Sequence, residues 1–599
     1  MSENLANSGG RKGGDTTGAH DSRRAWRPSC YERAMVRFPG PMNLFGMITV
    51  SASRDYAVLA LRSFFRHTPA ERIGAFVLLD NDGDFEWPAD VPTEHVTVLR
   101  NASPLGFAAN ANVLLGRARE HGADLFLLNN DLVFTAGWLD PLLADRPAIL
   151  GPVSNAELPY RTATFALQPV MALADYVGHE DELDQLANAH RASHSGYQRV
   201  AAQPFFCVKI PATVYNGVGD FDERFGRGGA EDRDYTIRAW LAGFPHEIAL
   251  GSYVLHFQGR STWRGGETPE DTAARNEGYT TALRAKWGDA LAYAFLQNSW
   301  NLFLSNAPLA VGIRNRRFGP VIEHLRANPS LEPFFERQRH ARFGAVCCIY
   351  DDDAWIGPTV ESVYEAVAGI WFLVSDRPWR GEPSDQEPLI AKIRALPDPD
   401  GKIHVVRGSW PDEATQRNKG LRLLAEAGID YCMVLDADEV HEPPRLLEAM
   451  QHVRQRAHVD VWRMHMFTYW KSCRYRVDPP ESFLPVVFVR VGIARFTENR
   501  DMRTGRQQVV PEATAMMHHM SYARTNEQVQ RKIETFSHAS QMVSGWYERV
   551  WLGWDTDRAI ENLNPCWPGA YRRIVEQPRD ALPAALRSCW DAAHPAASN

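Results

Sequence analysis

The sequence predicts an α/β protein in which two parallel-sheet domains follow one another along the chain. Two apolar runs, Asp124–Asp131 and Tyr431–Glu439, each end abruptly in side-chain oxygens. A continuous apolar run of this kind is typical of a buried parallel strand. The same order of strands and helices surrounds both runs, as in α/β folds. A chain of 599 residues is also too long for one hydrophobic core, which favours two large domains.

The first half gives a succession of expected elements. Strands are expected at Met47–Ser53, Ala75–Gly83, His95–Leu99 and Asp124–Asp131, and helices at Tyr56–Phe65 and Gly106–Leu115. The second half starts again in the same order. Strands are expected at Phe343–Tyr350, Ile370–Asp376, Ile403–Val406, Tyr431–Leu435, Val461–Trp470 and Pro485–Arg490, and helices at Gln416–Leu424 and Asn526–Gly545.

The boundaries follow from these patterns. We expect a flexible basic tail at 1–45, a first domain at 46–290, a helical connector at 291–342, a second domain at 343–578 and a C-terminal tail at 579–599. The basic tail is either simply disordered or in weak contact with an anionic membrane surface. Arginines at positions 314, 316 and 317 keep a membrane-surface role open for the connector.

Composition excludes several classes of protein. The chain is 44% hydrophobic and 23% charged, with a net charge of -8 and a sequence pI near 6.2, which argues against a nucleic-acid binder. No apolar window reaches the length of a membrane span and no apolar signal core follows the N-terminus, so we expect a soluble, cytoplasmic protein. The eight cysteines have no metal-binding spacing, and most should be reduced.

The polar residues behind the strands point to a ligand site. In open α/β sheets, ligands bind beyond the carboxyl ends of the strands. Asp436, Asp438 and Glu439 follow one such strand. Their hard oxygens suit Mg²⁺ or Mn²⁺ holding a diphosphate. The alternative is that Asp438 or Glu439 only caps the helix that begins near Pro443.

Three motifs of the first half carry a resemblance to a known family. Asp80-Asn81-Asp82-Gly83, then Leu105-Gly106-Phe107-Ala108 with Asn112, and then Asn129-Asn130-Asp131 resemble successive motifs of the family 2 glycosyltransferases of GT-A fold. The resemblance implies that Asp80, Asn112 and Asn130 contact a nucleotide-sugar. It also implies that Asp131 is the metal-binding carboxylate of the DxD motif, with Asn129 where the family commonly has another acid.

A fourth motif extends the resemblance. Gly228–Tyr235 is similar to the family's acidic ED motif, which supplies the catalytic base, and implies Asp232 as that base beside Glu231. The plain alternative is that acids in a first helical turn stabilise the helix dipole. His256 resembles a family histidine near the metal and phosphates.

The second half also looks like this family. Asp376 takes the place of Asp80, Arg417 lies at the nucleotide-binding helix, and Asp436-Ala437-Asp438 is closer to a standard DxD. His519 is a candidate third metal ligand, although core or surface packing would explain it equally. No ED motif follows. The carboxylates available as a second base are Asp478, Glu481 and Glu498.

The resemblance implies a bifunctional, metal-dependent, inverting glycosyltransferase. It would transfer sugars from nucleoside-diphosphate donors to a growing glycan or lipid-linked glycan, at the inner face of the plasma membrane if membrane contact occurs. Two alternatives stay open: one half is catalytic and the other binds sugar or acceptor, or the protein is a sugar nucleotidyltransferase. Four tryptophans could stack on sugar rings or close a hydrophobic core: Trp546, Trp551, Trp554 and Trp567.

Overall fold

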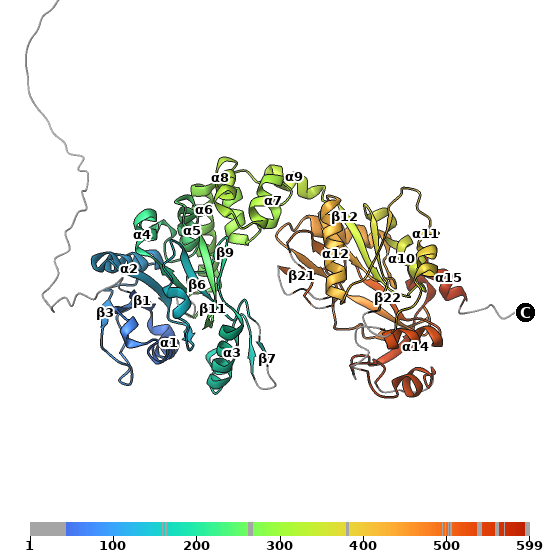
Figure 1. The fold of residues 1–599 in the computed structure, drawn as a ribbon, viewed down its shortest axis with the longest axis horizontal. Helices are drawn as coiled ribbons and strands as arrows, with labels where there is room; N and C mark the ends of the chain where they lie inside the picture. Colours follow the sequence, from blue (N-terminus) through green and yellow to red (C-terminus); the bar gives the residue numbers. More distant parts are fainter. Residues whose placement is uncertain are drawn as a thin grey trace, which may run out of the picture. The chain divides into compact units, whose positions relative to one another are not determined.

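The computed structural model describes residues 43–158, 160–161, 165–260, 267–378, 382–493, 495–497, 499–500, 502, 506–535, 542–556, 562–567 and 569–592. Three predicted features lie outside these ranges: the basic tail up to residue 42, residues 536–541 of the last expected helix, and Glu498. Within them, the chain is a mixed α/β protein with two parallel-rich sheets (Figure 1).

The first sheet has the strand order β3-β2-β1-β4-β10-β6-β11-β5, and β9 pairs with β11. Strands β1 to β4 are mutually parallel, and β10 runs antiparallel to β4. The bounds are β1 Asn43–Thr49, β2 Ala75–Asp80, β3 Val96–Arg100, β4 Asp124–Asn129, β5 Leu132–Phe134, β6 Ile149–Val153, β9 Tyr197–Val200, β10 Cys207–Ile210 and β11 His246–His256, with β7 Tyr160–Arg161 and β8 Ala166–Leu167 as a separate pair.

Helices pack on this sheet because each presents an apolar stripe to it. Phe64 of α1 contacts the ring of Phe45 on β1, and Leu114 of α2 closes against Gly46 of the same strand. The bounds are α1 Arg54–His67, α2 Phe107–His121, α3 Glu180–Ser193, α4 Ala212–Val218, α5 Glu231–Leu241 and α6 Pro269–Gln297. The region predicted as connector is helical, with α7 Ala307–Arg314, α8 Phe318–Ala327 and α9 Glu332–Arg339.

The second parallel-rich sheet has the order β14-β13-β12-β15-β20-β17-β21. Its pairing repeats that of the first sheet. Strands β12, β13, β14 and β15 are mutually parallel, and β20 runs antiparallel to β15. The bounds are β12 Phe343–Ile349, β13 Ile370–Ser375, β14 Ile403–Gly408, β15 Tyr431–Leu435, β17 Val461–Arg463, β20 Val486–Arg490 and β21 Gln507–Val509. Its helices are α10 Ile356–Val363, α11 Glu387–Arg394, α12 Glu413–Glu426 and α13 Pro443–Arg454.

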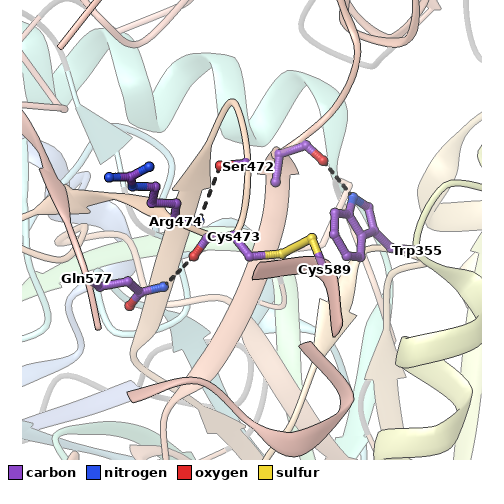
Figure 2. The surroundings of a disulfide bond; sticks show 7 residues. Trp355, Ser472, Cys473, Arg474, Gln577 and Cys589 are labelled. Atoms are coloured by element: carbon purple, nitrogen blue, oxygen red, sulfur yellow. Dashed lines mark hydrogen bonds between the residues drawn. A yellow bond between two sulfur atoms is a disulfide. The ribbon is translucent and has the colours of Figure 1, made fainter. Parts of the chain in front are cut away.

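A smaller sheet of order β16-β22-β18-β19-β23 follows. Its bounds are β16 Glu439–Val440, β22 Met517–Tyr522, β18 Met466–Trp470, β19 Tyr475–Asp478 and β23 Arg573–Glu576, and α14 Asn526–Thr535 and α15 Ala584–Ala592 accompany it. A disulfide between Cys473 and Cys589 links α15 to the turn between β18 and β19 (Figure 2). The spacing of the cysteines gave no sign of this bond. Cys207, Cys347, Cys348 and Cys432 are buried thiols that are not in a disulfide.

Three expected elements differ from the structure. The helix expected at Asn526–Gly545 is helical over Asn526–Thr535, and the described residues 542–545 are not helical. The first strand is β1 at 43–49 and not 47–53, because the apolar residues from Leu44 to Ile48 are the ones that pair with β2 and β4. The single run expected at 461–470 is two strands in different sheets, β17 and β18, since the chain breaks its pairing between Arg463 and Met466. Periodicity alone cannot reveal such a change of sheet.

Candidate functional site

The carboxyl ends of the parallel strands in the first sheet gather several of the predicted residues. Asp80, at the end of β2, is fully buried. Its two oxygens accept hydrogen bonds from the backbone N–H groups of Gly83 (2.9 Å) and Phe85 (2.9 Å). The next residue, Asn81, accepts from the side chains of Asn101 (2.8 Å) and Asn110 (3.0 Å). These bonds fix the turn that shapes this edge of the sheet.

Asn130 and Asp131 follow β4 at the same edge, and both are fully buried. The Asn130 amide donates to the hydroxyls of Thr49 (2.9 Å) and Ser53 (2.7 Å). One oxygen of Asp131 accepts from the backbone N–H of Arg260 (2.9 Å). The other, Oδ1, lies 3.4 Å from Nε2 of His256.

The Asp131 and His256 atoms fit a divalent cation. Asp131 Oδ1 and His256 Nε2 are buried and make no hydrogen bond in the described part of the chain. Buried polar atoms of this kind need a partner. A carboxylate oxygen and a histidine nitrogen side by side are suitable ligands. Among the described residues, no group of three or more His, Cys, Asp or Glu is placed to hold a metal, so the other ligand positions would fall to substrate oxygens and water.

The acids at the start of α5 have separate environments. Glu231 is buried, and one of its oxygens accepts from the backbone N–H of Gly229 (2.5 Å). Burial and the neighbouring Asp232 raise the pKa of Glu231 to about 7. Asp232 is half-buried, and its Oδ1 accepts from the N–H of Arg233 (2.7 Å). Of these acids, Asp232 is the more accessible to an acceptor.

Asp234 is a structural acid. It is fully buried and accepts from Trp287 Nε1 (2.8 Å), Lys286 Nζ (2.6 Å) and Arg238 Nε (2.9 Å). These bonds tie α5 to α6. They therefore fix the direction of the helix that carries Glu231 and Asp232.

A glycine loop brings α5 close to α2. A Cβ on Gly106, before α2, would lie 2.0 Å from the carbonyl oxygen of Gly226, and one on Gly229 would lie 2.2 Å from the Tyr279 ring. Gly229 also has φ of +124°, which favours glycine. Since α2 begins beside Asn81, Glu231 lies near the edge that Asp80 and Asp131 occupy.

Asn112 lies one turn into α2 and anchors a loop. Its amide group donates to the carbonyl of Phe221 (3.0 Å), and its oxygen accepts from the N–H of the same residue (2.8 Å). In the second half, Asn418 makes the same pair of bonds to Phe496, at 2.9 and 2.9 Å. This match aligns α2 with α12 and sets Arg417 at the position of Ala111.

Asp436 is enclosed by two arginines. Its Oδ1 accepts from Arg417 (2.8 Å) and its Oδ2 from Arg500 (3.0 Å). Arg500 also pairs with the buried Glu439. Burial opposes the charge of Asp436, but the two guanidinium groups outweigh it and lower the pKa of its carboxyl to about 2. Both oxygens of Asp436 are thus used inside the protein.

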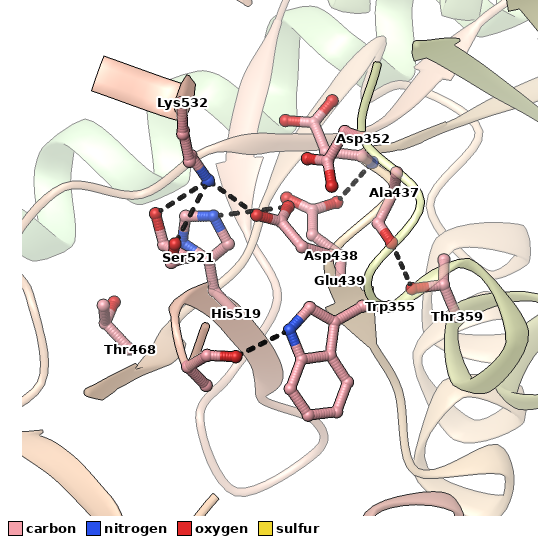
Figure 3. Close-up of polar contacts among 12 residues, drawn as sticks. Asp352, Trp355, Thr359, Ala437, Asp438, Glu439, Thr468, His519, Ser521 and Lys532 are labelled. Atoms are coloured by element: carbon pink, nitrogen blue, oxygen red, sulfur yellow. Dashed lines mark hydrogen bonds and ion pairs between the residues drawn. The ribbon is translucent and has the colours of Figure 1, made fainter. Parts of the chain in front are cut away.

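Asp438 repeats the arrangement of Asp131. Its Oδ2 accepts from Arg524 (2.8 Å). Figure 3 shows its other contacts: Oδ2 also accepts from Lys532 (2.7 Å), and Oδ1 lies 3.6 Å from Nε2 of His519. Burial opposes its ionisation, yet the charges of Lys532 and Arg524 hold the pKa of Asp438 well below its usual value. Burial also lowers the pKa of His519 to about 4, which keeps the imidazole neutral.

The strand register makes the two acid and histidine pairs equivalent. In the first half, the residue after Asp131 pairs with His256 across antiparallel strands β5 and β11. In the second half, the residue after Asp438 pairs with His519 across antiparallel strands β16 and β22. The Asp438 and His519 pair occupies the equivalent place, but the buried ring atom without a hydrogen bond in the described part of the chain is His519 Nδ1 and not Nε2. Two cations, Arg524 and Lys532, already hold the other oxygen of Asp438, and Asp436 does not offer a vacant oxygen.

A cavity of about 770 Å³ opens beside Asp438. Residues from three regions line it: Asp351 to Ala354 after β12, the Asp436 to Glu439 turn, and the segment from His519 to Lys532. Glu481, Phe483, Trp567 and Tyr571 line it as well. Asp376, by contrast, follows β13, forms an ion pair with Arg407 (2.5 Å) and is absent from the described lining of this cavity.

The tryptophans named from the sequence divide between core and cavity. Trp546 and Trp551 are buried and pack against Trp470. Trp554 is half-buried beside the same cluster. Trp567 is 53% exposed and lines the cavity.

Sequence reasoning missed Arg500, Arg524 and Lys532, because no spacing rule links them to Asp436 or Asp438. Lys532 lies 94 positions from Asp438 along the chain. The one available signal was the pair Arg531-Lys532 in the helix that follows His518 and His519. In the parts of the chain that the structure describes, no helix is both long and apolar enough to cross a membrane.

Comparison with known proteins gives weak likenesses only. No protein-family model and no curated protein matches the chain. Similar solved structures include GalNAc-T7 with UDP, GalNAc and Mn²⁺ (TM-score 0.31, 15% identity, 49% of this chain and 56% of that one) and S. aureus TarS (0.27, 12%, 49% and 54%). Another is S. aureus TarS 1–349 in complex with UDP-GlcNAc (0.26, 12%, 49% and 89%). The matched part spans little more than half of the first two structures. At these TM-scores, the likenesses support no argument about this chain.

Proposed function

We propose that this protein is a nucleotide-sugar glycosyltransferase with two GT-A domains of family 2 type, at residues 46–290 and 343–578. The observation that supports it most is the repeated pair of an aspartate and a histidine in one register, Asp131 with His256 and Asp438 with His519. Each pair follows the fourth strand of a sheet whose first four strands have the same order. Ligands bind at this edge of such sheets.

In the first half, different residues bind the metal, shape the donor side and accept the proton. Asp131 and His256 would hold a Mn²⁺ or Mg²⁺ ion, which when bound stabilises negative charge on the leaving diphosphate. The backbone turn fixed by Asp80 and the cluster around Asn81 shape the donor side. Asp232 accepts the proton of the acceptor hydroxyl as that oxygen attacks the anomeric carbon. A single displacement of this kind inverts the anomeric centre.

In the second half, an aspartate and a histidine again take the metal-binding place, but charged residues replace neutral ones beside them. Asp438 and His519 would hold the cation there. Arg417 takes the place of Ala111 and Asp436 the place of Asn129, so an ion pair replaces a neutral pair. In the second half, the first acid of the DxD motif, Asp436, pairs with arginines inside the protein and does not face the ligand site. The first half therefore does not need an acid at the equivalent position, which is Asn129.

The two sites suggest two successive additions to a glycan or lipid-linked glycan. On the donor side we place Asp80, Asn112, Asn130, Asp376 and Arg417. Asp80 and Asn112 hold the surrounding backbone, whereas the other three bond to neighbouring side chains. A protein that only binds sugars would not require an acid at the start of α5 in addition to the acid and histidine pairs.

The test is nucleotide release from a panel of nucleoside-diphosphate sugars with Mn²⁺. We compare wild type with Asp232→Asn for the first site and with His519→Gln for the second. Asp220→Asn is the matched control, because Asp220 is exposed and pairs with Arg119. We expect Asp232→Asn to lower turnover of one donor by about 100-fold or more, the usual worth of a base. We expect His519→Gln, which removes a proposed metal ligand, to lower turnover of another donor.

The result of this assay distinguishes two catalytic halves from one. Loss of a different donor in each variant supports two enzymes in one chain. Loss in one variant alone indicates that the other half binds acceptor or sugar. If wild type and both variants release nucleotide equally from every donor tried, the assignment of these sites is wrong.

A further inference from the structure

The second cavity has a side that the proposed donor site does not use. Glu481 and Phe483 approach it from the segment before β20, and Trp567 and Tyr571 approach it from the segment before β23. Phe483 is 57% exposed and Trp567 53% exposed. Large aromatic side chains left this open on a cavity rim commonly mark a binding surface. Aromatic faces also pack against the apolar faces of other rings.

The carboxylates of this cavity differ in their partners. Apart from Glu481, those that line it among the described residues each lie within 3.7 Å of an arginine or lysine nitrogen. They are Asp351, Asp352, Asp353, Glu413, Asp436, Asp438 and Glu439. A nearby cation opposes protonation of a carboxylate, but burial outweighs this at Glu439, whose pKa it raises to about 7, and at Asp351, whose pKa it also raises. Glu481 therefore differs from these carboxylates in its partners.

Glu481 is held by hydroxyl groups. Thr468 Oγ1 donates to its Oε1, and the phenol of Tyr571 also hydrogen-bonds to it. Burial raises the pKa of Glu481. The side chain is therefore oriented by neutral donors, and its affinity for a proton is higher than that of an exposed glutamate.

Strand register places Glu481 at a useful separation from Asp438. Thr468 on β18 pairs with His519 on β22, which pairs in turn with Glu439 on β16, next to Asp438. Neighbouring strands are ~4.8 Å apart, so two spacings put Thr468 roughly 10 Å from β16. Because Thr468 bonds to Glu481, the acid and histidine pair and Glu481 lie on separate strands but line the same cavity.

We infer that Glu481 is the catalytic base of the second site, and that Trp567 and Phe483 hold the acceptor sugar beside it. This inference rests on the proposed function. The acceptor hydroxyl gives its proton to a Glu481 oxygen, and its own oxygen forms the new bond to the anomeric carbon. The bond from that carbon to the diphosphate oxygen breaks, and its electron pair leaves with the diphosphate. No further reactant is needed.

Three carboxylates were considered from the sequence as the second base, and of the described ones only Glu481 lines this cavity. Asp478 pairs with Arg573 and does not line the described cavity wall. Glu498 lies outside the described residues. Asp478→Asn, three positions away, is therefore a matched control for Glu481→Gln.

The experiment measures sugar binding and donor consumption separately, on the full chain. Binding is measured by calorimetry with a panel of p-nitrophenyl glycosides, for wild type, Trp567→Ala and Phe483→Ala. Leu447→Ala is the control, since Leu447 is 51% exposed but lies outside the cavity lining. Nucleotide release from the donor that His519→Gln fails to use is then measured for Glu481→Gln and Asp478→Asn.

We expect at least one glycoside to bind wild type, and Trp567→Ala to weaken it about tenfold while Leu447→Ala leaves it unchanged. Glu481→Gln should bind the glycoside and the donor as wild type does, yet lower kcat by about 100-fold or more. Equal turnover in Glu481→Gln and wild type would refute the base. Absence of glycoside binding in wild type, or binding insensitive to both aromatic variants, would refute the acceptor surface.

Failure of the proposed function has a different signature. In that case no nucleoside-diphosphate sugar is consumed by wild type, whereas glycosides still bind in a manner that depends on Trp567. Consumption of a donor without dependence on Glu481 leaves the glycosyltransferase reading intact and removes only this base.

Discussion

The buried carboxylate of Asp234 provides a sharp test of which acids at the start of α5 are structural. Asp234→Asn keeps the shape of the side chain but removes its charge. It also turns an amide toward three nitrogen donors, those of Trp287, Lys286 and Arg238. We expect this change to loosen α5 and α6 without altering the fold elsewhere.

The size of the effect follows from the contacts. Breaking a buried ion pair by removing one partner costs about 3–5 kcal/mol. Lys286 keeps its bond to Asp222 (2.6 Å), and Arg238 keeps its bonds to two backbone carbonyls, at 2.9 and 2.8 Å. Both cations therefore retain partners, and the low end, about 3 kcal/mol, is the appropriate figure.

Hydrogen exchange followed by mass spectrometry measures this locally. A loss of about 3 kcal/mol corresponds to exchange roughly 100-fold faster in peptides of α5 and of α6 up to residue 287. Asp232→Asn is the control and should leave exchange unchanged, because the contacts of Asp232 that the structure describes do not join the two helices. Exchange in Asp234→Asn within twofold of wild type would refute the reasoning.

Three further predictions concern single contacts. Gly229→Ala places a Cβ 2.2 Å from the Tyr279 ring, and should lower turnover at the first site at least tenfold in the nucleotide-release assay, with α5 still protected from exchange. Asn418→Ala removes two hydrogen bonds to Phe496 and should lower the free energy of unfolding of this region by about 2 kcal/mol, measured by hydrogen exchange. Asp436 has a folded pKa near 2 against a usual 3.8, so its stabilisation is present above pH ~4 and is lost as the pH falls toward 2; acid titration of Asp436→Asn should lack this loss.

Two control variants test the physical reasons given for Gly229→Ala and Asn418→Ala. Gly219→Ala also has a positive φ but has no atom within 4 Å of the new Cβ, so it reports backbone strain without a clash. Asn112→Ala removes the equivalent bonds in the first half and should act on that half alone. If Asn418→Ala and Asn112→Ala leave exchange unchanged, the loop anchors contribute nothing measurable.

Much of the fold could be predicted from local pattern. The apolar runs before Asn129 and Asp436 are β4 and β15, because a strand covered on both faces needs apolar residues at every position. The place of Asp131 and Asp438 at the edge of a sheet followed from the same runs. The break of pairing between Arg463 and Met466 could not be predicted, since apolar residues continue through it.

The sequence alone determined which carboxylates stand at the strand ends and which histidines could join them, because strand ends are set by short-range pattern. Only the tertiary structure decided how each acid is used. Asp436 faces Arg417 and Arg500 and is held inside the protein, whereas Asp438 keeps one oxygen toward His519. Our inference of Glu481 over Asp478 rests on contacts of the same kind, since Glu481 lines the cavity and Asp478 pairs with Arg573. These partners lie many positions away along the chain, and a charge is directed by whichever partner the fold brings within a few ångströms.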